Sequence, residues 1–496
     1  MSPPPPEPLH HVQTLLGRKY RNPWPSASFP ALNELFGGAW LGMPMMELRR
    51  AAESGKGVRP VEVVKPDWGK AEVQTLKKEA TPFPDSGEDS FVRGTWLGHA
   101  GAFVELPVSP SSSPSSFSAD PPTLKLLFDP IFSSRAGPGD SFGPKRVHPP
   151  PCEVRDLPGV DAVLISHNHY DHLDLGTIKD VMAEWPKARY FVPLGNKPWF
   201  LSLGIPAALV FEADWWDEVD LPPAALSPSR SRRKRRKEVA APAAGSAEQR
   251  EVIRITCVPA QHTSGRGILD QRSTLCSAII RNVYSPRTGQ QAMDAACDTG
   301  YRPFYTSPVI CPAFKALGDH YGPFDLSFVP IWRGGTLGFV SAMGLRLRHR
   351  NLPCATHGSP GDAVQIHIDV KSRNTVSMHF GTFEGSNLEA LEALTDLRAA
   401  QNAARVRELD DEKETSRNGR MGRLDIGETY VVRDTLAKHH ACQLPSSRFS
   451  ASPASCPSKR TSETGNAERE SHHLEKWEEK LVEKEILECW EYHESW

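Results

Sequence analysis

The sequence predicts an α/β protein in which strands and helices alternate along the chain and stack in layers. Short apolar segments with the length of strands recur through the chain and are bounded by Gly, Pro or Asp. One of them, Asp161–Ile165, is a continuous apolar run (DAVLI), as expected of a strand buried on both faces. Segments with helical character, near 174–184 and 360–371, lie between the strand candidates. This alternation is the pattern of a layered α/β fold.

The strand candidates follow one another in a regular order. The first two, Phe91–Leu97 and Ala102–Leu106, flank a turn that contains two glycines. The third, Leu124–Phe128, ends at an Asp-Pro pair. The segment Gln291–Cys297 is also interpreted as a strand, although it is less apolar than the others. The remaining candidates are 161–165, 189–193, 252–258, 275–283, 326–331 and 375–380.

Changes in composition divide the chain into three parts. Residues 1–90 are Pro-rich and weakly patterned, and we expect them to drape over the core. Residues 91–395 carry the strand and helix pattern and form the predicted main domain. Low-complexity inserts near 107–122 and 222–250 interrupt this domain and are expected to be disordered loops. Residues 396–496 are polar and predict a largely disordered tail that ends in a charged helix.

Composition also limits the functional classes. Lys and Arg number 58 and Asp and Glu number 60, and the net charge of −2 argues against a specific nucleic-acid binder. No apolar stretch reaches the roughly 18 residues of a membrane-spanning helix, and the N-terminus lacks the pattern of a secretory signal. The nine cysteines include no CxxC pair, which favours free thiols in a reducing compartment. We therefore expect an intracellular protein, cytoplasmic or peripherally associated with membranes, that is not secreted.

The second insert contains a block of positive charge. Residues 229–237 read SRSRRKRRK within an Ala/Pro-rich setting. A solvated loop without an essential role is one interpretation. A nuclear address and a contact with anionic lipid are the functional alternatives, and the sequence leaves all three open.

A string of metal-ligand residue types directly follows the predicted strand 161–165. Residues His167 and His169 lie two apart on an extended loop, so both imidazoles can face one cation. Asp171 and His172 fall at the turn into the next helix and can face a second cation. Imidazole and carboxylate suit zinc, iron or manganese. A histidine-rich surface loop is the alternative, but the position of the string after a buried strand makes a metal site the better interpretation.

Two metal ions need more ligands than this loop supplies. Three downstream residues at strand ends or turns are candidates: His262, Asp298 and His379. A buried, hydrogen-bonded histidine is a common alternative for each residue alone. Because all three follow the first string along the chain, together they are stronger evidence for a metal site than each residue is alone.

These motifs resemble the metallo-β-lactamase superfamily, whose hallmark is a His-x-His-x-Asp-His string followed by His, Asp and His ligands in that order. Within the superfamily, the chain is similar to the phospholipases D that hydrolyse N-acylphosphatidylethanolamine. The similarity runs discontinuously from about Arg21 to about Glu389 and leaves out both inserts and the tail. It is carried by Arg21–Pro25, Thr95–Ala100, Phe128–Ala136, Gly143–Arg146, Asp161–Asp174, Asp214–Trp216, Pro259–His262, Asp298–Tyr301, Asp362–His367 and His379–Phe383.

The resemblance implies an αβ/βα sandwich, with two mixed sheets flanked by helices, as the catalytic domain. It implies two Zn²⁺ ions, or another divalent transition metal, that share a hydroxide nucleophile. The resemblance assigns Asp171 and Asp298 to catalysis as well as to metal binding. By position, His167, His169 and His262 would hold one ion, Asp171, His172 and His379 the other, and Asp298 would bridge them. His99 and Asp129 would orient ligands, and Tyr170 and His357 would lie beside the substrate.

The implied function is a zinc-dependent phosphodiesterase of the phospholipase D type. It would hydrolyse N-acylphosphatidylethanolamine, at a membrane surface, to an N-acylethanolamine and phosphatidic acid. Another hydrolase of the same fold (a nuclease, lactonase or thioesterase) is one alternative, because a fold does not determine a substrate. A scaffold protein with a structural metal site is the other. We expect a phospholipid as partner and no specific nucleic acid, and a homodimer is compatible with the sequence.

Overall fold

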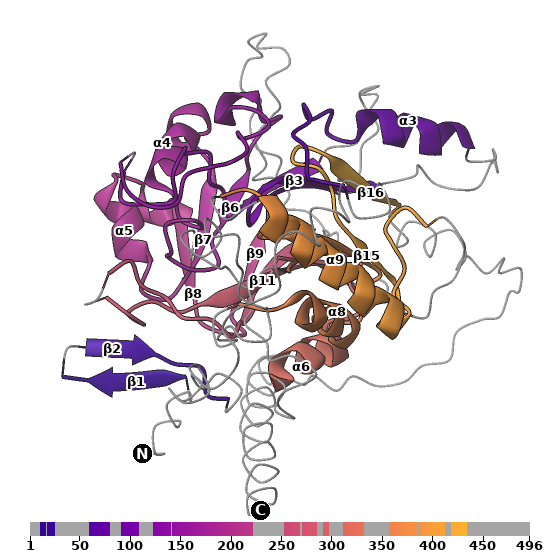
Figure 1. The fold of residues 1–496 in the computed structure, drawn as a ribbon. Coiled ribbons are helices and arrows are strands. Elements are labelled where there is room, and N and C mark those ends of the chain that lie inside the picture. The colour runs from indigo at the N-terminus through magenta and orange to yellow at the C-terminus, as the bar shows by residue number, and fades with distance from the viewer. Residues whose placement is uncertain are drawn as a thin grey trace, which may run out of the picture.

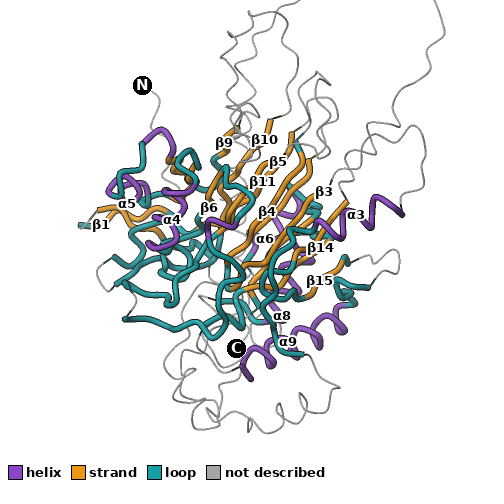
Figure 2. Tube along the Cα trace, turned by 90° about the horizontal axis from the view of Figure 1, so that it is seen from above, coloured by secondary structure: helices purple, strands orange, loops and turns teal. Residues whose placement is uncertain are grey.

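Two seven-stranded mixed sheets face each other in the described part of the chain, and helices cover their outer sides (Figures 1 and 2). Helices α4 and α5 lie against the first sheet, whereas α6, α8 and α9 lie against the second (Figure 1). This arrangement is the αβ/βα sandwich expected from the sequence. The computed structural model describes residues 10–15, 17–24, 59–79, 91–108, 123–139, 141–221, 252–267, 270–284, 291–296, 311–331, 357–383, 387–411 and 418–433.

The first sheet has the order β16-β3-β4-β5-β6-β7-β8. Its pairs from β16 to β5 are antiparallel, and those from β5 to β8 are parallel. Its strands are β3 (Phe91–Gly98), β4 (Gly101–Pro107), β5 (Thr123–Phe128), β6 (Ala162–Leu164), β7 (Arg189–Pro193), β8 (Val210–Ala213) and β16 (Thr429–Arg433).

The second sheet has the order β15-β14-β13-β12-β11-β10-β9. Like the first sheet, it has an antiparallel half and a parallel half. The pairs from β9 to β12 are antiparallel, and those from β12 to β15 are parallel. Its strands are β9 (Glu218–Leu221), β10 (Val252–Pro259), β11 (Ser277–Tyr284), β12 (Gln291–Ala296), β13 (Leu326–Pro330), β14 (Asn374–Met378) and β15 (Arg420–Gly422).

Two of the described helices, α4 and α8, begin at side chains that cap them. Asp174 accepts a hydrogen bond from the backbone N–H of Thr177 at the start of α4, and Ser359 and Asp362 form a capping box at the start of α8. The helices are α3 (Lys70–Glu79), α4 (Leu175–Glu184), α5 (Lys197–Ser202), α6 (Pro312–His320), α8 (Pro360–Asp369) and α9 (Asn387–Ala404), with 3₁₀ turns η2 (Val154–Asp156) and η3 (Ala207–Leu209).

The central strands bury both faces, as the apolar run DAVLI predicts. In β6, Ala162 and Leu164 join the core between the two sheets, whereas Val163 joins the core beneath α4 and α5. This alternation follows from the period of two along a strand. The sheets approach closely where β3 crosses the second sheet, because a Cβ on Gly94 would lie only 2.6 Å from the Leu326 side chain. Glycine at this position therefore permits the two sheets to pack.

The folded region extends beyond the predicted domain boundary at residue 395. Helix α9 runs across that boundary to Ala404, and its Leu394 and Leu397 are buried in the core. Strand β15 then pairs with β14, and β16 returns to pair with β3 at the edge of the first sheet. These strands are short and partly polar, so their hydrophobic pattern is weak. The described fold therefore continues to residue 433.

The described parts of residues 1–90 contact the main body. Strands β1 (His11–Thr14) and β2 (Gly17–Tyr20) form a hairpin, after which the Trp24 ring stacks on Trp215 at 5.4 Å between centroids. Val61 is buried in the core. The basic block 229–237 and the predicted terminal helix lie outside the described residues. None of the described helices has both the length and the apolar character needed to cross a bilayer.

Candidate metal centre

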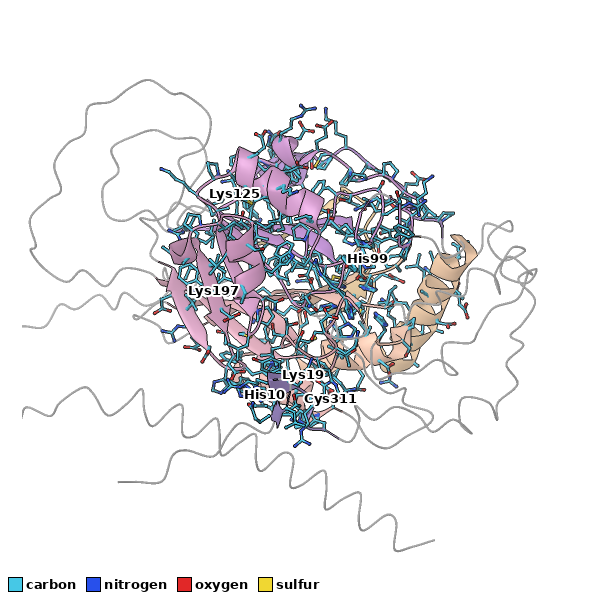
Figure 3. The ribbon with its side chains drawn as sticks, turned by 90° about the vertical axis from the view of Figure 1, so that its left-hand side faces the viewer. His10, Lys19, His99, Lys125, Lys197 and Cys311 are labelled. Atoms are coloured by element: carbon cyan, nitrogen blue, oxygen red, sulfur yellow. The ribbon has the colours of Figure 1, made fainter. Side chains whose placement is uncertain are left out.

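Loops that follow strands of both sheets bring two clusters of ligand-type side chains together. The loop after β6 supplies residues to both clusters, because it turns sharply into α4: the backbone N–H groups of His172 and Leu173 both donate to the His169 carbonyl. His99 comes from the β3–β4 turn and is labelled in Figure 3. The first cluster consists of His167, His169 and His262, and the second of His99, Asp171, His172 and His379.

The first cluster is a compact group of three imidazoles. His169 Nδ1 lies 3.0 Å from His167 Nε2 and 3.2 Å from His262 Nε2. His167 and His262 are buried, and His169 is partly exposed. Tetrahedral bonds of about 2.0 Å to imidazole nitrogens give a nitrogen–nitrogen separation of about 3.3 Å. The spacing and chemistry of the three rings therefore fit a single divalent ion.

The second cluster combines imidazoles with one carboxylate. His172 Nε2 and His379 Nε2 are 3.3 Å apart. Asp171 Oδ2 lies 3.5 Å from His172 Nε2 and 3.7 Å from His379 Nε2. The rings of His167 and His172 are 4.1 Å apart between centroids, so the two clusters are direct neighbours. This mixed nitrogen and oxygen donor set suits a divalent transition metal.

Asp129 organises ligands of both clusters. Its Oδ2 accepts hydrogen bonds from His172 Nδ1 at 2.9 Å and from the Ser166 hydroxyl at 2.5 Å, while Oδ1 accepts from the Ser166 backbone N–H at 2.7 Å. The Ser166 oxygen in turn accepts from His167 Nδ1 at 2.9 Å. Both imidazoles therefore carry their proton on Nδ1, which leaves each Nε2 available to a metal ion. One buried carboxylate thus sets the tautomer in both clusters.

His99 belongs to the second cluster itself. Its Nε2 lies 2.8 Å from Asp171 Oδ2, so the ring is grouped with the candidate ligands, and the predicted role of orienting a ligand stays a prediction. Burial, together with the nearby His379, lowers the pKa of His99 to about 3, so the ring is neutral at neutral pH. The His99 carbonyl accepts a hydrogen bond from the His379 backbone N–H at 2.8 Å. The β3–β4 turn and the loop after β14 are therefore joined at this point.

The Asp171 carboxyl is held in its ionised form. Burial alone would raise its pKa, but electrostatic attraction by the adjacent His172 ring and hydrogen bonds with His379 and His99 outweigh this effect and hold the pKa well below its usual range. An ionised carboxylate is the form that binds a metal ion.

The two predicted substrate residues lie in different surroundings. The His357 ring is 5.2 Å from both the His262 ring and the His379 ring between centroids, so it borders both clusters. Tyr170 instead lies under the guanidinium of Arg266, whose Cζ is 4.6 Å from the ring centroid. Asp298 lies outside the described residues. Strand β12, which precedes Asp298 in the sequence, pairs with β11 and β13.

Sequence reasoning missed residues that brace the metal loop. Arg266 Nε donates to the Asn168 carbonyl at 2.6 Å, and another of its nitrogens donates to the Leu173 carbonyl. Asn22 Nδ2 donates to the His262 carbonyl at 3.0 Å. The Arg21–Pro25 motif contains Asn22, but the sequence did not indicate which residue Asn22 contacts. Ser166 adjoins the histidine string directly, but its hydrogen bonds with Asp129 depend on a tertiary contact that the sequence does not display.

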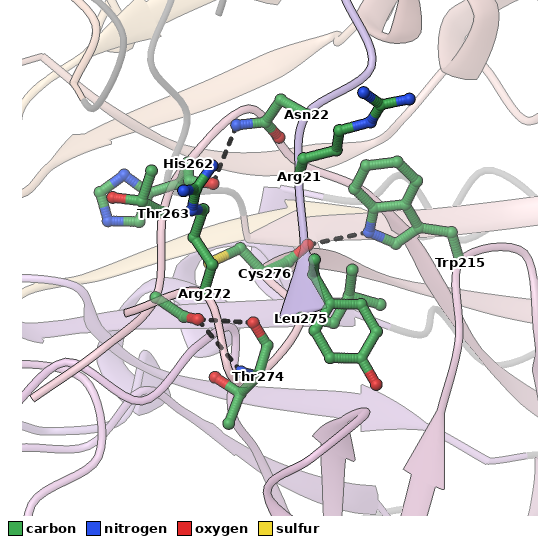
Figure 4. Close-up of a pocket in the computed structure, with 11 residues that line it drawn as sticks. Arg21, Asn22, Trp215, His262, Thr263, Arg272, Thr274, Leu275 and Cys276 are labelled. Atoms are coloured by element: carbon green, nitrogen blue, oxygen red, sulfur yellow. Dashed lines mark hydrogen bonds between the residues drawn. The ribbon is translucent and has the colours of Figure 1, made fainter. Parts of the chain in front are cut away.

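A small pocket opens beside the first cluster (Figure 4). It lies between the end of β2, with the segment that follows it, and the loop that follows β10. Arg21 and Arg272 line it together with the ligand candidate His262. The other lining residues are Tyr20, Asn22, Trp215, Thr263, Ser264, Thr274, Leu275 and Cys276.

Comparison with known proteins agrees with this architecture. The sequence profile of a family described as the β-lactamase superfamily domain matches residues 125–380. N-acyl-phosphatidylethanolamine-hydrolyzing phospholipase D 1 of Caenorhabditis elegans is 28% identical over 359 residues, which cover 71% of this chain and 78% of that protein. The mitochondrial N-acyl-phosphatidylethanolamine-hydrolyzing phospholipase D of Saccharomyces cerevisiae is 25% identical over 340 residues, which cover 65% of this chain and 58% of that protein.

Among solved structures, Igni18, a metallo hydrolase of Ignicoccus hospitalis, is similar with a TM-score of 0.39 and 14% identity, over 69% of this chain and 99% of that one. The family match spans more than half of the 496-residue chain. It contains the histidine string after β6, as well as His262 and His379. The chain therefore belongs to the β-lactamase superfamily, as a hydrolase with the metallo-β-lactamase fold.

Proposed function

We propose that the protein is a zinc-dependent phosphodiesterase of the phospholipase D type. Its substrate is N-acylphosphatidylethanolamine, and its products are an N-acylethanolamine and phosphatidic acid. The observation that carries the proposal is the 28% identity, over 71% of the chain, to a Caenorhabditis elegans protein named for this reaction. The clustered candidate ligands support it, because phosphodiester hydrolysis at paired metal ions needs such a donor set.

In this proposal, the first cluster holds one Zn²⁺ ion and the second cluster holds the other. Asp298 is proposed as a further carboxylate ligand. When bound, a pair of divalent cations supplies a nucleophile by lowering the pKa of water and stabilises negative charge on phosphoryl oxygens. The side chains of the protein contribute orientation: Asp129 and Ser166 hold the Nδ1 protons of His172 and His167 away from the ligand positions.

The charge around the site favours an anionic diester over neutral substrates. Arg21 and Arg272 line the pocket beside His262, and guanidinium groups pair well with phosphate. A lactone or a thioester offers no phosphate for such a contact. A nuclease would share the phosphate but would need a basic surface, whereas the net charge of the chain is −2. We propose that His357 contacts the substrate from between the clusters, and that Tyr170 does so from beside Arg266.

The test is turnover of N-acylphosphatidylethanolamine by the purified full-length chain in mixed micelles, followed by chromatography of both products. A lactone, a thioester and single-stranded RNA serve as competing substrates. We expect rapid turnover of the phospholipid alone. His262→Ala should lose this activity, because it removes one imidazole from the first cluster. His320→Ala, which alters an exposed histidine at the end of α6, is the matched control. Preferential turnover of another substrate class would overturn the proposal.

A further inference from the structure

A third group of ligand-type side chains lies outside the two clusters at the centre. It joins the start of the β1–β2 hairpin, His10 and His11, to Asp214 in the turn after β8. One ligand atom from each of the three residues lies within 4.8 Å of the others. We propose that His10, His11 and Asp214 form a separate structural metal site for Zn²⁺ or a similar divalent ion, which fastens the N-terminal hairpin to the body.

The two imidazoles approach opposite oxygens of one carboxylate. His10 Nε2 lies 2.7 Å from Asp214 Oδ1, and His11 Nε2 lies 2.8 Å from Asp214 Oδ2. The exposed fractions of the side chains are 2% for His10, 7% for His11 and 21% for Asp214. Water therefore reaches the group mainly from the side of the carboxylate. Two histidines and one carboxylate, with a further position open to water, are a common zinc donor set.

Surrounding groups hold these side chains in place. The His10 ring stacks on Trp215 at 4.1 Å between centroids, and the His11 ring meets Tyr20 edge-on at 5.3 Å. Asp214 Oδ1 also accepts a hydrogen bond from the Trp215 backbone N–H at 2.8 Å. Contacts of this kind orient ligands in metal sites. Figure 3 labels His10 at the edge of the molecule, well apart from His99.

The alternative to a metal ion is direct contact of the two rings with Asp214, through the hydrogen bond of His10 and the 2.8 Å approach of His11. Tetrahedral coordination would separate neighbouring ligand atoms by about 3.3 Å, about half an ångström more than the present contacts. Small side-chain rotations can supply this difference. A metal ion would link residues 204 positions apart in the chain and so stabilise the docked hairpin. Asn22, which follows the hairpin, contacts the His262 carbonyl, so docking also supports the central site.

The test measures metal content and local protection in the full-length chain. After removal of metal by a chelator and dialysis against Zn²⁺, we expect Asp214→Asn to retain one zinc ion fewer than wild type, by elemental analysis. His320→Gln, which alters an exposed histidine at the end of α6, should retain the wild-type content. Hydrogen exchange of peptides covering residues 10–24 should slow when Zn²⁺ is added to wild type, and should not respond in Asp214→Asn.

A second variant keeps the test decisive if Asp214→Asn does not fold. His11→Gln leaves the contact of His10 with Asp214 and the stack on Trp215, yet removes one ligand. In this variant, the Zn²⁺ concentration needed for half-maximal protection of residues 10–24 should rise by about tenfold or more. Equal zinc content in wild type and variants would overturn the proposal. Hydrogen exchange of the wild-type hairpin that does not respond to Zn²⁺ would also overturn it. Direct contacts with Asp214 alone would then hold His10 and His11 in place.

Discussion

Replacing Asp129 by Asn removes one negative charge with almost no change in shape. Asp129 Oδ2 accepts from both the Ser166 hydroxyl and His172 Nδ1. If the amide oxygen keeps the contact with the Ser166 backbone N–H, the amide NH₂ group faces these two donors. His172 then relaxes by moving its proton to Nε2, the atom that faces His379. Ser166 also loses its acceptor, which loosens the hydrogen bond from His167 Nδ1.

The expected cost follows from these contacts. A hydrogen bond to a charged group contributes about 1.5–3 kcal/mol, which corresponds to roughly 10–100-fold in metal affinity. We therefore expect Asp129→Asn to bind Zn²⁺ about 10–100-fold more weakly than wild type, with lower turnover at limiting zinc. The assay is competition with a chromophoric chelator, alongside circular dichroism.

Asp161→Asn is the matched control. Asp161 is also a buried carboxylate and accepts a hydrogen bond from the Lys125 backbone N–H at 2.9 Å, but at the opposite ends of β5 and β6. The Asp161→Asn protein should bind Zn²⁺ with the affinity of wild type. Wild-type zinc affinity in a natively folded Asp129→Asn protein would refute the proposed control of the tautomers.

Three further expectations concern stability and mechanism. Arg266→Met should lower the free energy of unfolding in urea by about 2 kcal/mol, because it removes hydrogen bonds to the Asn168 and Leu173 carbonyls; an unchanged midpoint would contradict this role. Burial lowers the pKa of His367 to about 4, below the unfolded value near 6.5, so its contribution to stability is present above pH 6.5 and is lost as the pH falls towards 4. Between pH 7 and pH 5, wild type should lose about 2 kcal/mol more stability than His367→Gln, and equal losses would exclude this linkage. In water enriched in heavy oxygen, attack of water at phosphorus places the label in phosphatidic acid; label in the N-acylethanolamine would exclude that attack.

Local pattern was enough to predict the centre of the fold. The apolar run before Ser166 marks β6 because a strand buried on both faces needs apolar residues at successive positions. Strand β14 ends at Met378, directly before His379, close to the end predicted from sequence. The ligand candidates were visible because residue type and chain order carry the metal-binding chemistry, and four of them lie within one loop.

Features that depend on distant partners were not visible in the sequence. Strand β15 has only three residues, and its pairing with β14 joins segments that local periodicity cannot connect. The boundary at 395 cut through α9 because the chain becomes polar there, although Leu397 is still buried. The contact of Asp129 with Ser166 spans 37 positions, and that of His10 with Asp214 spans 204. Such contacts follow from tertiary packing, not from spacing along the chain.

Metal reconstitution tests the central claim most directly, because it links the two clusters to the reaction. The full-length protein is stripped with a chelator, and Zn²⁺ is added in steps while turnover of N-acylphosphatidylethanolamine is followed. We predict that activity vanishes on stripping and returns as Zn²⁺ is restored, and that His262→Ala shows no such return at the same zinc concentrations. Full activity in the stripped protein, or equal recovery in His262→Ala, would contradict the assignment of the reaction to this metal centre.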